Sequence, residues 1–541
     1  MNWKKIVTIL AITTLLTGTL AACSSSPKNK ETAPTEQGAE NTNAGKETNG
    51  EQANGETTSF LVSEKPIKMT VHMGTKESGV FKNDWGIFKR AAELTNVTLE
   101  GTLPSTVADF GETFSIVIAS GNLPDIMQAL SQDFVKYGPE GAFLKLNDLI
   151  DEHAPHLKKF FEENPDVKSA ASDSEGNIWF IPFIADGEPE KGWFIRKDWL
   201  EKLQLDEPKT VDDLYHVMTA FANDDPNGNN KKDEIPFFHR NTIKGIEGLL
   251  ALWDGYMDYR IFDDKVIFGP LEPEYGVAME NVAKWYKEGL IDKEIFTRGG
   301  KARDVLLADD IGGLTHDFFA STGNYNEQLE GKIEGFRFDP MLPPADVNGK
   351  VKEPSKRDRS KNFGWGLAHS NPDPVAAVKY LDFWFTEEGR RMANFGVEGD
   401  TYTMVDGSPV FTDKVMKSDK APLDVIIETG AQSGFGFHQD YAYEEQWTLP
   451  LALEGINEYK KHDVFMDKYP LLKFTDAEQK EIQKINPKVE TYIVETRQQW
   501  ILGAKPVDHA SFAKELEKLG ARKLVDINQA AYERYVEEMK Q

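Results

Sequence analysis

Residues 67–73 read Ile67-Lys68-Met69-Thr70-Val71-His72-Met73, with apolar and polar side chains in alternation. This period of two predicts a β-strand that buries one face. A helical pattern follows at residues 84–94, and a second strand is expected at residues 97–99. A strand, a helix and a strand in succession are typical of α/β layers, in which helices cover a sheet. The sequence therefore predicts an α/β fold.

Further along the chain the pattern becomes mainly helical. An apolar run at residues 114–119 is followed by a break at 120–125 and by a strand that restarts near residue 126. Helical periodicity predicts helices at residues 146–163, 211–223, 375–395, 477–484, 488–501 and 511–519. No internal repeat is found. With 541 residues the chain is too long for one ordinary domain, so we expect at least two lobes.

The composition excludes several classes of protein. Hydrophobic residues make up 40% of the chain, which is enough to build sizeable cores. Asp and Glu number 89 against 62 Lys and Arg, a formal charge of −27 that would repel a nucleic-acid backbone. The one cysteine excludes a disulfide scaffold and a thiolate zinc cluster. We therefore expect a globular protein that does not bind nucleic acid.

Residues 1–22 predict a lipoprotein signal peptide. Lys4 and Lys5 precede an apolar run at residues 6–16, and Leu20-Ala21-Ala22-Cys23 resembles the bacterial lipobox. The run is too short to span about 30 Å of hydrocarbon as a stable anchor. The resemblance implies cleavage before Cys23, a diacylglycerol thioether on its sulfur and acylation, for example by palmitate, of its new amine. An ordinary secretory signal with a chance cysteine is the alternative.

Residues 23–60 predict an acylated cysteine followed by a disordered tether. Between residues 24 and 59 there is no Val, Leu, Ile, Met or aromatic residue, so this segment has nothing to bury. A flexible chain of this length reaches roughly 30–37 Å. We expect the tether to hold a folded body, beginning near Phe60, away from the outer face of a cell membrane, of Gram-positive type.

Several motifs occur in an order that resembles a known family. After the lipobox and tether come SGNLPD at residues 120–125, RKDWL at 196–200, TEEG at 386–389 and AAYERY at 530–535. Together they resemble the family 1 extracellular solute-binding proteins of ABC importers, and in particular the lipoprotein subgroup named for LplA and LipO. The resemblance covers residues 67–535, and its specificity lies in the order of motifs that are individually weak.

The resemblance implies a two-lobed, periplasmic-binding-protein-like fold of type II, with crossover hinge strands and a helical C-terminal part. Lobe 1 would begin with residues 61–192, and the chain would cross at Trp193-Phe194-Ile195. The following segments are expected to be a first part of lobe 2 (193–340), a hinge and second part of lobe 1 (341–399), and a helical second part of lobe 2 (400–541). Ligands bind preferentially in clefts between domains, and such binders close around them.

One loop has the pattern of a calcium site. Asp225, Asn227, Asn229 and Asp233 supply side-chain oxygens at loop positions 1, 3, 5 and 9, with the main-chain carbonyl of Lys231 at position 7. A standard EF-hand has Gly at position 6 and Glu at position 12, whereas this loop has Asn230 and Pro236 there. Asn tolerates the left-handed turn, and Glu234 could close the site.

The same pattern resembles the calcium loop of alginate-type solute-binding proteins. The resemblance implies a structural Ca²⁺ that pins the loop after the helix at residues 211–223. A solvated turn rich in Asn, Gly and Asp is the alternative.

Carbohydrate sites combine aromatic platforms with a few polar side chains. The residues expected to contact a ligand are aromatics and polar residues that fall where the family places its cleft: Asn122, Asp125, Trp253, Tyr256, Asp317, Phe318, Trp365 and Trp447. Core packing is an equal alternative for each of them. Trp199, Trp285, Trp384 and Trp500 are expected to lie in the core. A strongly anionic ligand would need local Arg or Lys, for which Arg196 and the basic cluster at residues 356–361 are the candidates. Such a cluster is expected to be a solvated loop instead.

Catalytic motifs are absent from the sequence. There is no GxSxG elbow and no Walker GxxxxGK[ST] motif. We expect a monomeric binding protein without enzymatic activity that captures an oligosaccharide and delivers it to the transmembrane subunits of an ABC permease. A lipid-anchored glycan hydrolase and a ligand-sensing lipoprotein that partners a receptor are the alternatives.

Overall fold

The computed structural model describes residues 60–75, 79–107, 110–187, 191–240, 245–434 and 438–540. The signal peptide, Cys23 and all of the tether up to residue 59 lie outside these residues. From residue 59 onward the chain is one compact unit. Within the described part, no helix has both the length and the apolar character required to cross a membrane.

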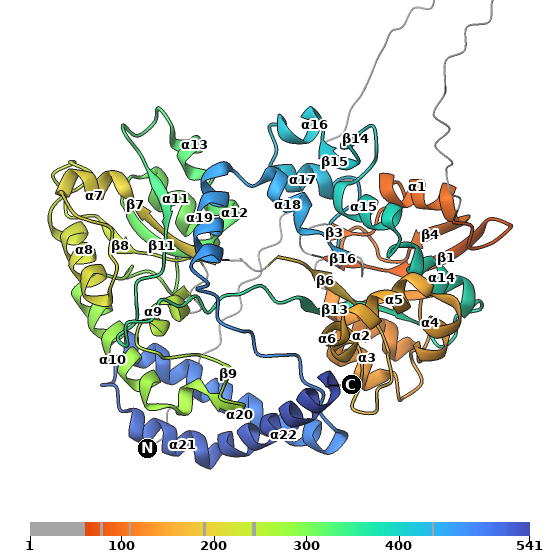
Figure 1. The fold of residues 1–541 in the computed structure, drawn as a ribbon. Helices are drawn as coiled ribbons and strands as arrows, with labels where there is room; N and C mark the ends of the chain where they lie inside the picture. Colours follow the sequence, from red (N-terminus) through yellow and green to blue (C-terminus); the bar gives the residue numbers. More distant parts are fainter. Residues whose placement is uncertain are drawn as a thin grey trace, which may run out of the picture. The chain divides into compact units, whose positions relative to one another are not determined.

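Lobe 1 is the part of the chain built around a six-stranded sheet (Figure 1). Its strands, in sheet order, are β16 (His438–Gln439), β6 (Ile181–Ala185), β13 (Ser360–Leu367), β5 (Ile126–Leu130), β1 (Ile67–His72) and β4 (Val97–Gly101). Strand β1 is parallel to both β4 and β5, and β13 is antiparallel to β5 and β6. Val71 and Met69 of β1 point into the core because alternate residues face the helices.

The helices of lobe 1 come from two separate stretches of the chain. They are α1 (Gly86–Thr95), α2 (Phe110–Ser120), α3 (Ser131–Tyr137), α4 (Asn147–His153), α5 (Pro155–Glu163), α6 (Pro165–Ala170), α14 (Pro374–Phe383), α15 (Glu387–Phe395), α16 (Asp413–Met416), α17 (Pro422–Ile427) and α18 (Tyr441–Trp447). Two short hairpins, β2 (Gly74–Thr75) with β3 (Gly79–Val80) and β14 (Tyr402–Val405) with β15 (Ser408–Phe411), complete the lobe.

Lobe 2 is the part built around a four-stranded sheet. Its strands, in sheet order, are β12 (Phe338–Met341), β7 (Lys191–Arg196), β11 (Gly312–Phe318) and β8 (Ile235–Phe237). Strand β7 is antiparallel to both β12 and β11, while β8 is parallel to β11. A separate hairpin pairs β9 (Tyr259–Phe262) with β10 (Lys265–Phe268).

The helices of lobe 2 include the long C-terminal ones. They are α7 (Lys197–Leu203), α8 (Val211–Asn223), α9 (Glu247–Ala251), α10 (Pro273–Glu288), α11 (Ala302–Ala308), α12 (Phe319–Thr322), α13 (Tyr325–Leu329), α19 (Pro450–Lys461), α20 (Asp476–Ile501), α21 (His509–Leu519) and α22 (Ala521–Met539). Helix α20 packs on α10, and α22 packs on α20 and β10. Trp285 and Trp500 lie in this core, and Trp199 and Trp384 are likewise buried, as expected.

The structure confirms the opening strand, helix and strand and corrects several later boundaries. The run at residues 114–119 belongs to helix α2, and the strand resumes at Ile126. The predicted helix at residues 146–163 is two helices because Pro155 begins the second one. Residues 476–501, in contrast, form one helix that contains Pro487. A capping box between Thr475 and Glu478 fixes where it starts.

Two expectations about the division between the lobes differ from the structure. Trp193-Phe194-Ile195 lies inside β7, within the sheet of lobe 2, so the crossover precedes Lys191. Residues 400–541 were expected in lobe 2, but Tyr402 and Tyr443 pack in the core of lobe 1, and β16 joins its sheet. The second part of lobe 2 therefore starts at α19, because the apolar residues before it complete the first core.

Candidate functional site

A cavity of about 280 Å³ lies between residues of lobe 2 and residues of lobe 1. Phe318 and Ser321 line it from the end of β11 and from α12. Lys361 lines it from β13, and Glu444 and Trp447 line it from α18. Among the residues predicted to contact a ligand, the structure therefore brings Phe318 and Trp447 to one cavity.

The Phe318 wall belongs to lobe 2 and carries positive charge beside the aromatic ring. Phe318 pairs with Lys191 across strands β11 and β7. The Lys191 ammonium and the Arg240 guanidinium each lie 5.4 Å from the centre of the Phe318 ring. At this distance a cation is attracted to the face of the ring. The wall thus combines an apolar surface with two cations.

Asp317 lies behind this wall and holds its arginines. It is 1% exposed, and it accepts hydrogen bonds of 2.7 and 3.0 Å from Nε and Nη2 of Arg240. Nη1 of Arg303 lies 3.1 Å from the same carboxylate. Burial opposes ionisation of Asp317, but the hydrogen bond from Arg240 and the two positive charges together hold the pKa of Asp317 below its usual value. Asp317 is therefore a positioning residue behind the cavity and not a direct contact.

The Trp447 wall belongs to lobe 1 and is carried by the seven-residue helix α18. Asp440 caps this helix, since its Oδ1 accepts the N–H of Ala442 at 3.1 Å. The ring of Tyr443 lies 6.2 Å from that of Trp447. Glu444 forms an ion pair of 2.8 Å with Arg357, and the Arg357 guanidinium lies 5.5 Å from the Tyr441 ring. Trp447 and the ion pair of Glu444 with Arg357 thus line the same cavity.

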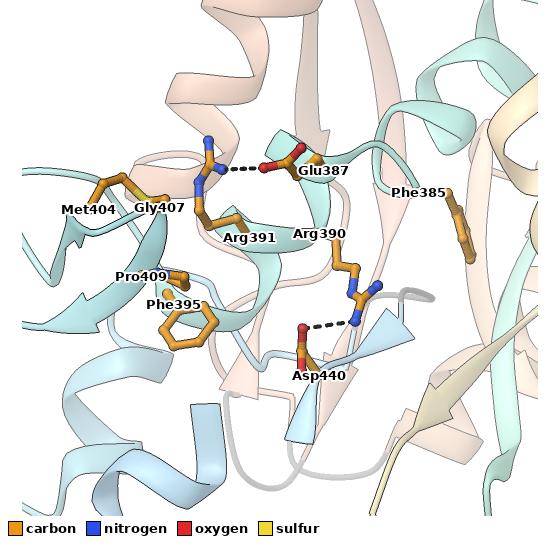
Figure 2. A pocket seen from close by; sticks show the side chains of 9 residues that line it. All are labelled: Phe385, Glu387, Arg390, Arg391, Phe395, Met404, Gly407, Pro409 and Asp440. Carbon is orange, nitrogen blue, oxygen red and sulfur yellow. Dashed lines mark hydrogen bonds and ion pairs between the residues drawn. The ribbon is translucent and has the colours of Figure 1, made fainter. Parts of the chain in front are cut away.

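A second cavity, of about 360 Å³, lies beside α15 in lobe 1 (Figure 2). Arg391 pairs with Glu387 on the same helix, while Nη2 of Arg390 reaches Oδ2 of Asp440 at 2.8 Å. Because Asp440 also caps α18, this ion pair links α15 to the helix that carries Trp447. Both arginines that line this cavity are paired with carboxylates. We infer that these ion pairs support the helix that carries Trp447.

Three of the predicted ligand contacts lie in the hydrophobic cores instead. Trp365 is 0% exposed, and Trp253 packs against Trp285 with ring centres 4.8 Å apart. Tyr256 is buried and donates its hydroxyl hydrogen to Asp254 at 2.6 Å. The prediction that these three residues face a ligand is corrected, because large aromatic side chains fill the interior of each lobe.

Close packing requires glycine on both sides of Trp365. A Cβ atom at Gly364 would lie 2.1 Å from the carbonyl oxygen of Ile181, and one at Gly366 would lie 2.3 Å from the Phe134 ring. The missing side chains therefore allow neighbouring strands and helix α3 to approach β13, and not a ligand to approach it.

Asn122 and Asp125 lie at the turn before β5 and line none of the cavities described above. Asn122 is exposed and its backbone N–H donates to Ser120. Oδ2 of Asp125 accepts hydrogen bonds from the backbone N–H and the hydroxyl of Thr70, at 2.7 and 2.8 Å. Asp125 thus joins the start of β5 to β1, which is a structural role.

Arg357 and Lys361 line the cavity but were not among the predicted ligand contacts. Both belong to the basic cluster that was expected to be a solvated loop. The signal was present as a cluster of positive charge in an acidic chain, but its position depends on the pairing of β13 with β5 and β6. Pairing between strands so distant in sequence is not visible in a local pattern.

The loop at residues 225–234 is folded by its own side chains. Oδ1 and Oδ2 of Asp225 accept the backbone N–H groups of Asn229 and Asn230, at 3.0 and 2.9 Å. Nδ2 of Asn229 donates to Asp233 at 3.0 Å, and Nδ2 of Asn227 lies 3.5 Å from the same carboxylate. Loop positions 1, 3, 5 and 9 therefore converge. Asn230 adopts φ 60°, the left-handed conformation expected at position 6.

The donor set of this loop suits a hard cation. Among the described residues no cluster of three His, Cys, Asp or Glu side chains is arranged to hold a metal. The loop mixes carboxylates with amide oxygens, and Oε1 of Glu234 is buried without a hydrogen-bond partner in the described part of the chain. Burial, together with the charges of Asp225 and Asp233, raises the pKa of Glu234. A divalent cation would satisfy that oxygen and offset the repulsion among the three acids.

Comparison with known proteins places these features in a family. The family model of the bacterial extracellular solute-binding proteins matches residues 88–391. The crystal structure of the alginate-binding protein AlgQ2 without calcium ion is 38% identical, with a TM-score of 0.78, over 88% of this chain and 99% of that one. FusA of Streptococcus pneumoniae, a fructooligosaccharide ABC transporter substrate-binding protein, is 27% identical over 89% of this chain and 92% of its own length.

The lipoprotein LipO of Bacillus subtilis is 26% identical over 78% of this chain and 84% of its own length. These likenesses support the resemblance inferred from the motifs and the two-lobed, periplasmic-binding-protein-like fold. The family, FusA and AlgQ2 are described as binding proteins. Given the extent of the family match, the chain belongs to the bacterial extracellular solute-binding proteins.

Proposed function

We propose that this chain is the substrate-binding protein of a carbohydrate ABC importer. It binds an oligosaccharide in the cavity between the Phe318 wall and the Trp447 wall and delivers it to a separate permease. The observation that carries the proposal is that one cavity is lined by an aromatic residue from each lobe. Sugar rings present apolar C–H faces that pack on aromatic rings, with hydroxyls at the edge for polar side chains.

Binding in this arrangement is coupled to closure of the lobes. An oligosaccharide that contacts both walls has more favourable contacts when the lobes are closed than when they are open. It therefore shifts the population towards the closed form, by no more than the difference between its affinities for the two forms. No covalent step is needed, and no catalytic residue is assigned.

The hydrolase alternative is disfavoured by the cavity. Most glycosidases require two carboxyl groups on either side of the scissile bond, about 5–9.5 Å apart. Of the described residues that line the cavity, Glu444 is the one carboxylate, and it is paired with Arg357 at 2.8 Å. One carboxylate in an ion pair does not supply the two carboxyl groups that this reaction requires.

The loop at residues 225–234 is proposed to bind a structural calcium ion. The proposal is supported by the convergence of its carboxylate and amide side chains, by the unpartnered Oε1 of Glu234 and by the likeness to AlgQ2, whose crystal form without calcium implies a form with it. When bound, the ion would neutralise Asp225, Asp233 and Glu234 and fix the segment between α8 and β8.

Membrane attachment is proposed through Cys23. The lipobox pattern and the likeness to the lipoprotein LipO support it. Two or three acyl chains, at about 0.8 kcal/mol per buried CH₂, hold a protein at a membrane firmly. The protein would act as a monomer on the outer face of the cell membrane, beside its permease, and a receptor-partnered sensor is the remaining alternative.

The proposed function is tested by titrating the full chain, purified in detergent with calcium, with a panel of oligosaccharides in a calorimeter. We expect saturable binding of at least one oligosaccharide, and mass spectrometry of the recovered ligand should show it unchanged. Cleaved products would establish the hydrolase instead. The absence of binding across neutral and acidic glycans would overturn the carbohydrate assignment.

A further inference from the structure

Gln439 lines the cavity from β16, the edge strand of the lobe 1 sheet, and it is half-buried there. Its main chain is already engaged, since β16 pairs with β6 and the carbonyl oxygen of Gln439 accepts the N–H of Asp186 at 3.1 Å. The side-chain amide is therefore the part of Gln439 that a ligand can use. A primary amide donates through its nitrogen or accepts through its oxygen, so its orientation decides which ligand group it binds.

The orientation of this amide is fixed by a chain of hydrogen bonds that starts at Asn394 of α15. Nδ2 of Asn394 lies 2.8 Å from the carbonyl oxygen of Arg390 and 2.9 Å from that of His438, and carbonyl oxygens only accept. Oδ1 of Asn394 accepts the N–H of Asp440 at 2.7 Å, and a backbone N–H only donates. Both ends of the Asn394 amide are thus assigned independently, by groups whose roles cannot reverse.

The assignment continues through Gln432 to Gln439. Nε2 of Gln432 lies 2.9 Å from Oδ1 of Asn394, which is an acceptor, so this end of Gln432 donates. Oε1 of Gln432 then accepts, and Nε2 of Gln439 donates to it at 2.9 Å. Nε2 of Gln439 also donates to the hydroxyl oxygen of Tyr443 at 2.6 Å. Both N–H groups of the Gln439 amide are therefore occupied by the protein.

Oε1 of Gln439 is the end of the amide that remains for a ligand. It forms no hydrogen bond with any residue that the structure describes. The amide lies at the edge of the Trp447 wall, because it contacts Tyr443, whose ring lies 6.2 Å from the ring of Trp447. A sugar ring that packs on an aromatic side chain presents its hydroxyls at the edge of the platform, where this oxygen lies.

We propose that Gln439 is a specificity-determining residue, whose Oε1 accepts a hydrogen bond from a hydroxyl of the oligosaccharide. This inference rests on the proposed function and names a residue by which the cavity recognises its ligand. Because both N–H groups are occupied, the amide selects a donor. An ether oxygen or a carboxylate at the same position would cover the carbonyl oxygen without pairing it, and an acceptor that is buried unpaired lowers affinity.

Calorimetry on the full chain with four trisaccharide probes tests this role. The probes are kestose, mannotriose, trigalacturonate and trimannuronate, and the variants are compared using the probe that the wild-type chain binds most tightly. Gln439→Met keeps the length of the side chain and removes its amide, and it should raise Kd about 5-fold to 10-fold. Gln529→Met is the matched control and should leave Kd unchanged. Gln529 is also half-buried, but its Oε1 accepts the N–H of Val266 at 2.8 Å and it does not line the cavity.

Two further measurements distinguish a direct contact from a structural role. Gln432→Met removes the group that orients the amide but leaves Gln439 at the cavity, so Kd should rise less than in Gln439→Met. Monodeoxyfluoro derivatives of the same probe report the direction of the hydrogen bond, because fluorine cannot donate one. One derivative should bind the wild-type chain about 5-fold to 10-fold more weakly than the parent probe does. Gln439→Met should bind that derivative and the parent equally, since the contact is already lost.

The outcomes separate this inference from the proposed function. Equal Kd values for Gln439→Met and the wild-type chain would overturn the role of Gln439 and leave the carbohydrate-binding function standing. An equal rise in Kd for Gln432→Met, or the absence of a derivative that loses affinity for the wild-type chain alone, would overturn it as well. If no probe binds the wild-type chain, both fail. If Gln439→Met does not fold, as judged by thermal unfolding, Gln439→Asn, whose amide is one methylene shorter, should show the same rise in Kd.

Discussion

In lobe 2, Phe318 ends a strand that has a neighbour on each side, whereas in lobe 1, Trp447 ends a helix of seven residues. Behind Phe318 lies Asp317, 1% exposed and shared by two arginines. The helix that carries Trp447 is capped at its other end by Asp440, which is half-buried and pairs with Arg390.

This difference indicates that the two walls contribute unequally to folding and to binding. A buried carboxylate between two guanidinium groups is expensive to disturb, so changes at the Phe318 wall should act first on stability. A short capped helix at the surface adds little to global stability, so changes at the Trp447 wall should act first on ligand affinity. The predictions below test this division.

The largest effect is expected for Asp317→Asn. Removing the shared charge leaves Arg240 and Arg303 without their carboxylate, and breaking a buried pair in this way costs about 3–5 kcal/mol of unfolding free energy. Asp400→Asn is the matched control, since Asp400 pairs with Lys414 at the surface of lobe 1, where such pairs contribute at most about 1 kcal/mol. Chemical denaturation measures both. Similar small losses in the two variants would contradict the division.

Calcium is expected to stabilise lobe 2 in particular. At 100 times its dissociation constant, an ion bound only by the folded state adds about 2.7 kcal/mol. Chelation should therefore lower the melting temperature, and added calcium should restore it. Hydrogen exchange should rise at β8, which follows the loop, and not at β6 of lobe 1.

Asp225→Ala provides the control for calcium, because it removes the first oxygen donor of the loop. The melting temperature of this variant should no longer respond to chelator. A wild-type protein that melts at the same temperature in excess chelator would show that the loop is only a solvated turn.

Trp447→Ala should weaken oligosaccharide binding and leave folding nearly intact. Losing an aromatic contact at the centre of a binding site costs about 2 kcal/mol, or about 30-fold in Kd. Trp447→Phe should recover part of this affinity. Phe262→Ala is the control, because Phe262 is exposed on the β9–β10 hairpin and does not line the cavity. A large fall in melting temperature with unchanged affinity would show that Trp447 contributes to folding and not to ligand binding.

Acid should destabilise the Phe318 wall through His239. Burial, opposed by the charge of Asp317, lowers the pKa of His239 to about 4. The unfolded chain then binds more protons than the folded one between about pH 6.5 and 4, so stability is full above this range and falls as the pH drops through it. The loss between about pH 7 and 5 is about 2 kcal/mol for this residue.

The slope of stability against pH measures this contribution. His239→Gln should reduce the slope, and the part that remains includes His72 of lobe 1, whose pKa burial also lowers. An unchanged slope in His239→Gln would show that His239 does not titrate as its burial implies.

The sequence predicted what short-range patterns determine. The alternation at residues 67–73, the helical periodicity at residues 211–223 and the oxygen spacing at residues 225–234 are local, and the first strand, this helix and the folded loop agree with the structure. Phe318 and Trp447, two of the residues expected to contact a ligand, line one cavity, and their contact with a ligand stays a prediction.

The features that could not be predicted from the sequence depend on contacts between distant segments. Trp365 was expected to contact a ligand, with the glycines on either side leaving room for it. Those glycines are instead required by the close packing of Ile181 and Phe134. Residues 400–447 were assigned to lobe 2, but they complete the core of lobe 1. Lys361 reaches the cavity only because β13 pairs with strands some 180 to 240 residues away.

The most direct test of the account is a crystal structure of the full chain bound to an oligosaccharide that it binds in the calorimeter. We expect an intact sugar chain in contact with Phe318 on one side and with Trp447 on the other. A ligand bound elsewhere, with both of these rings uncovered, would contradict it.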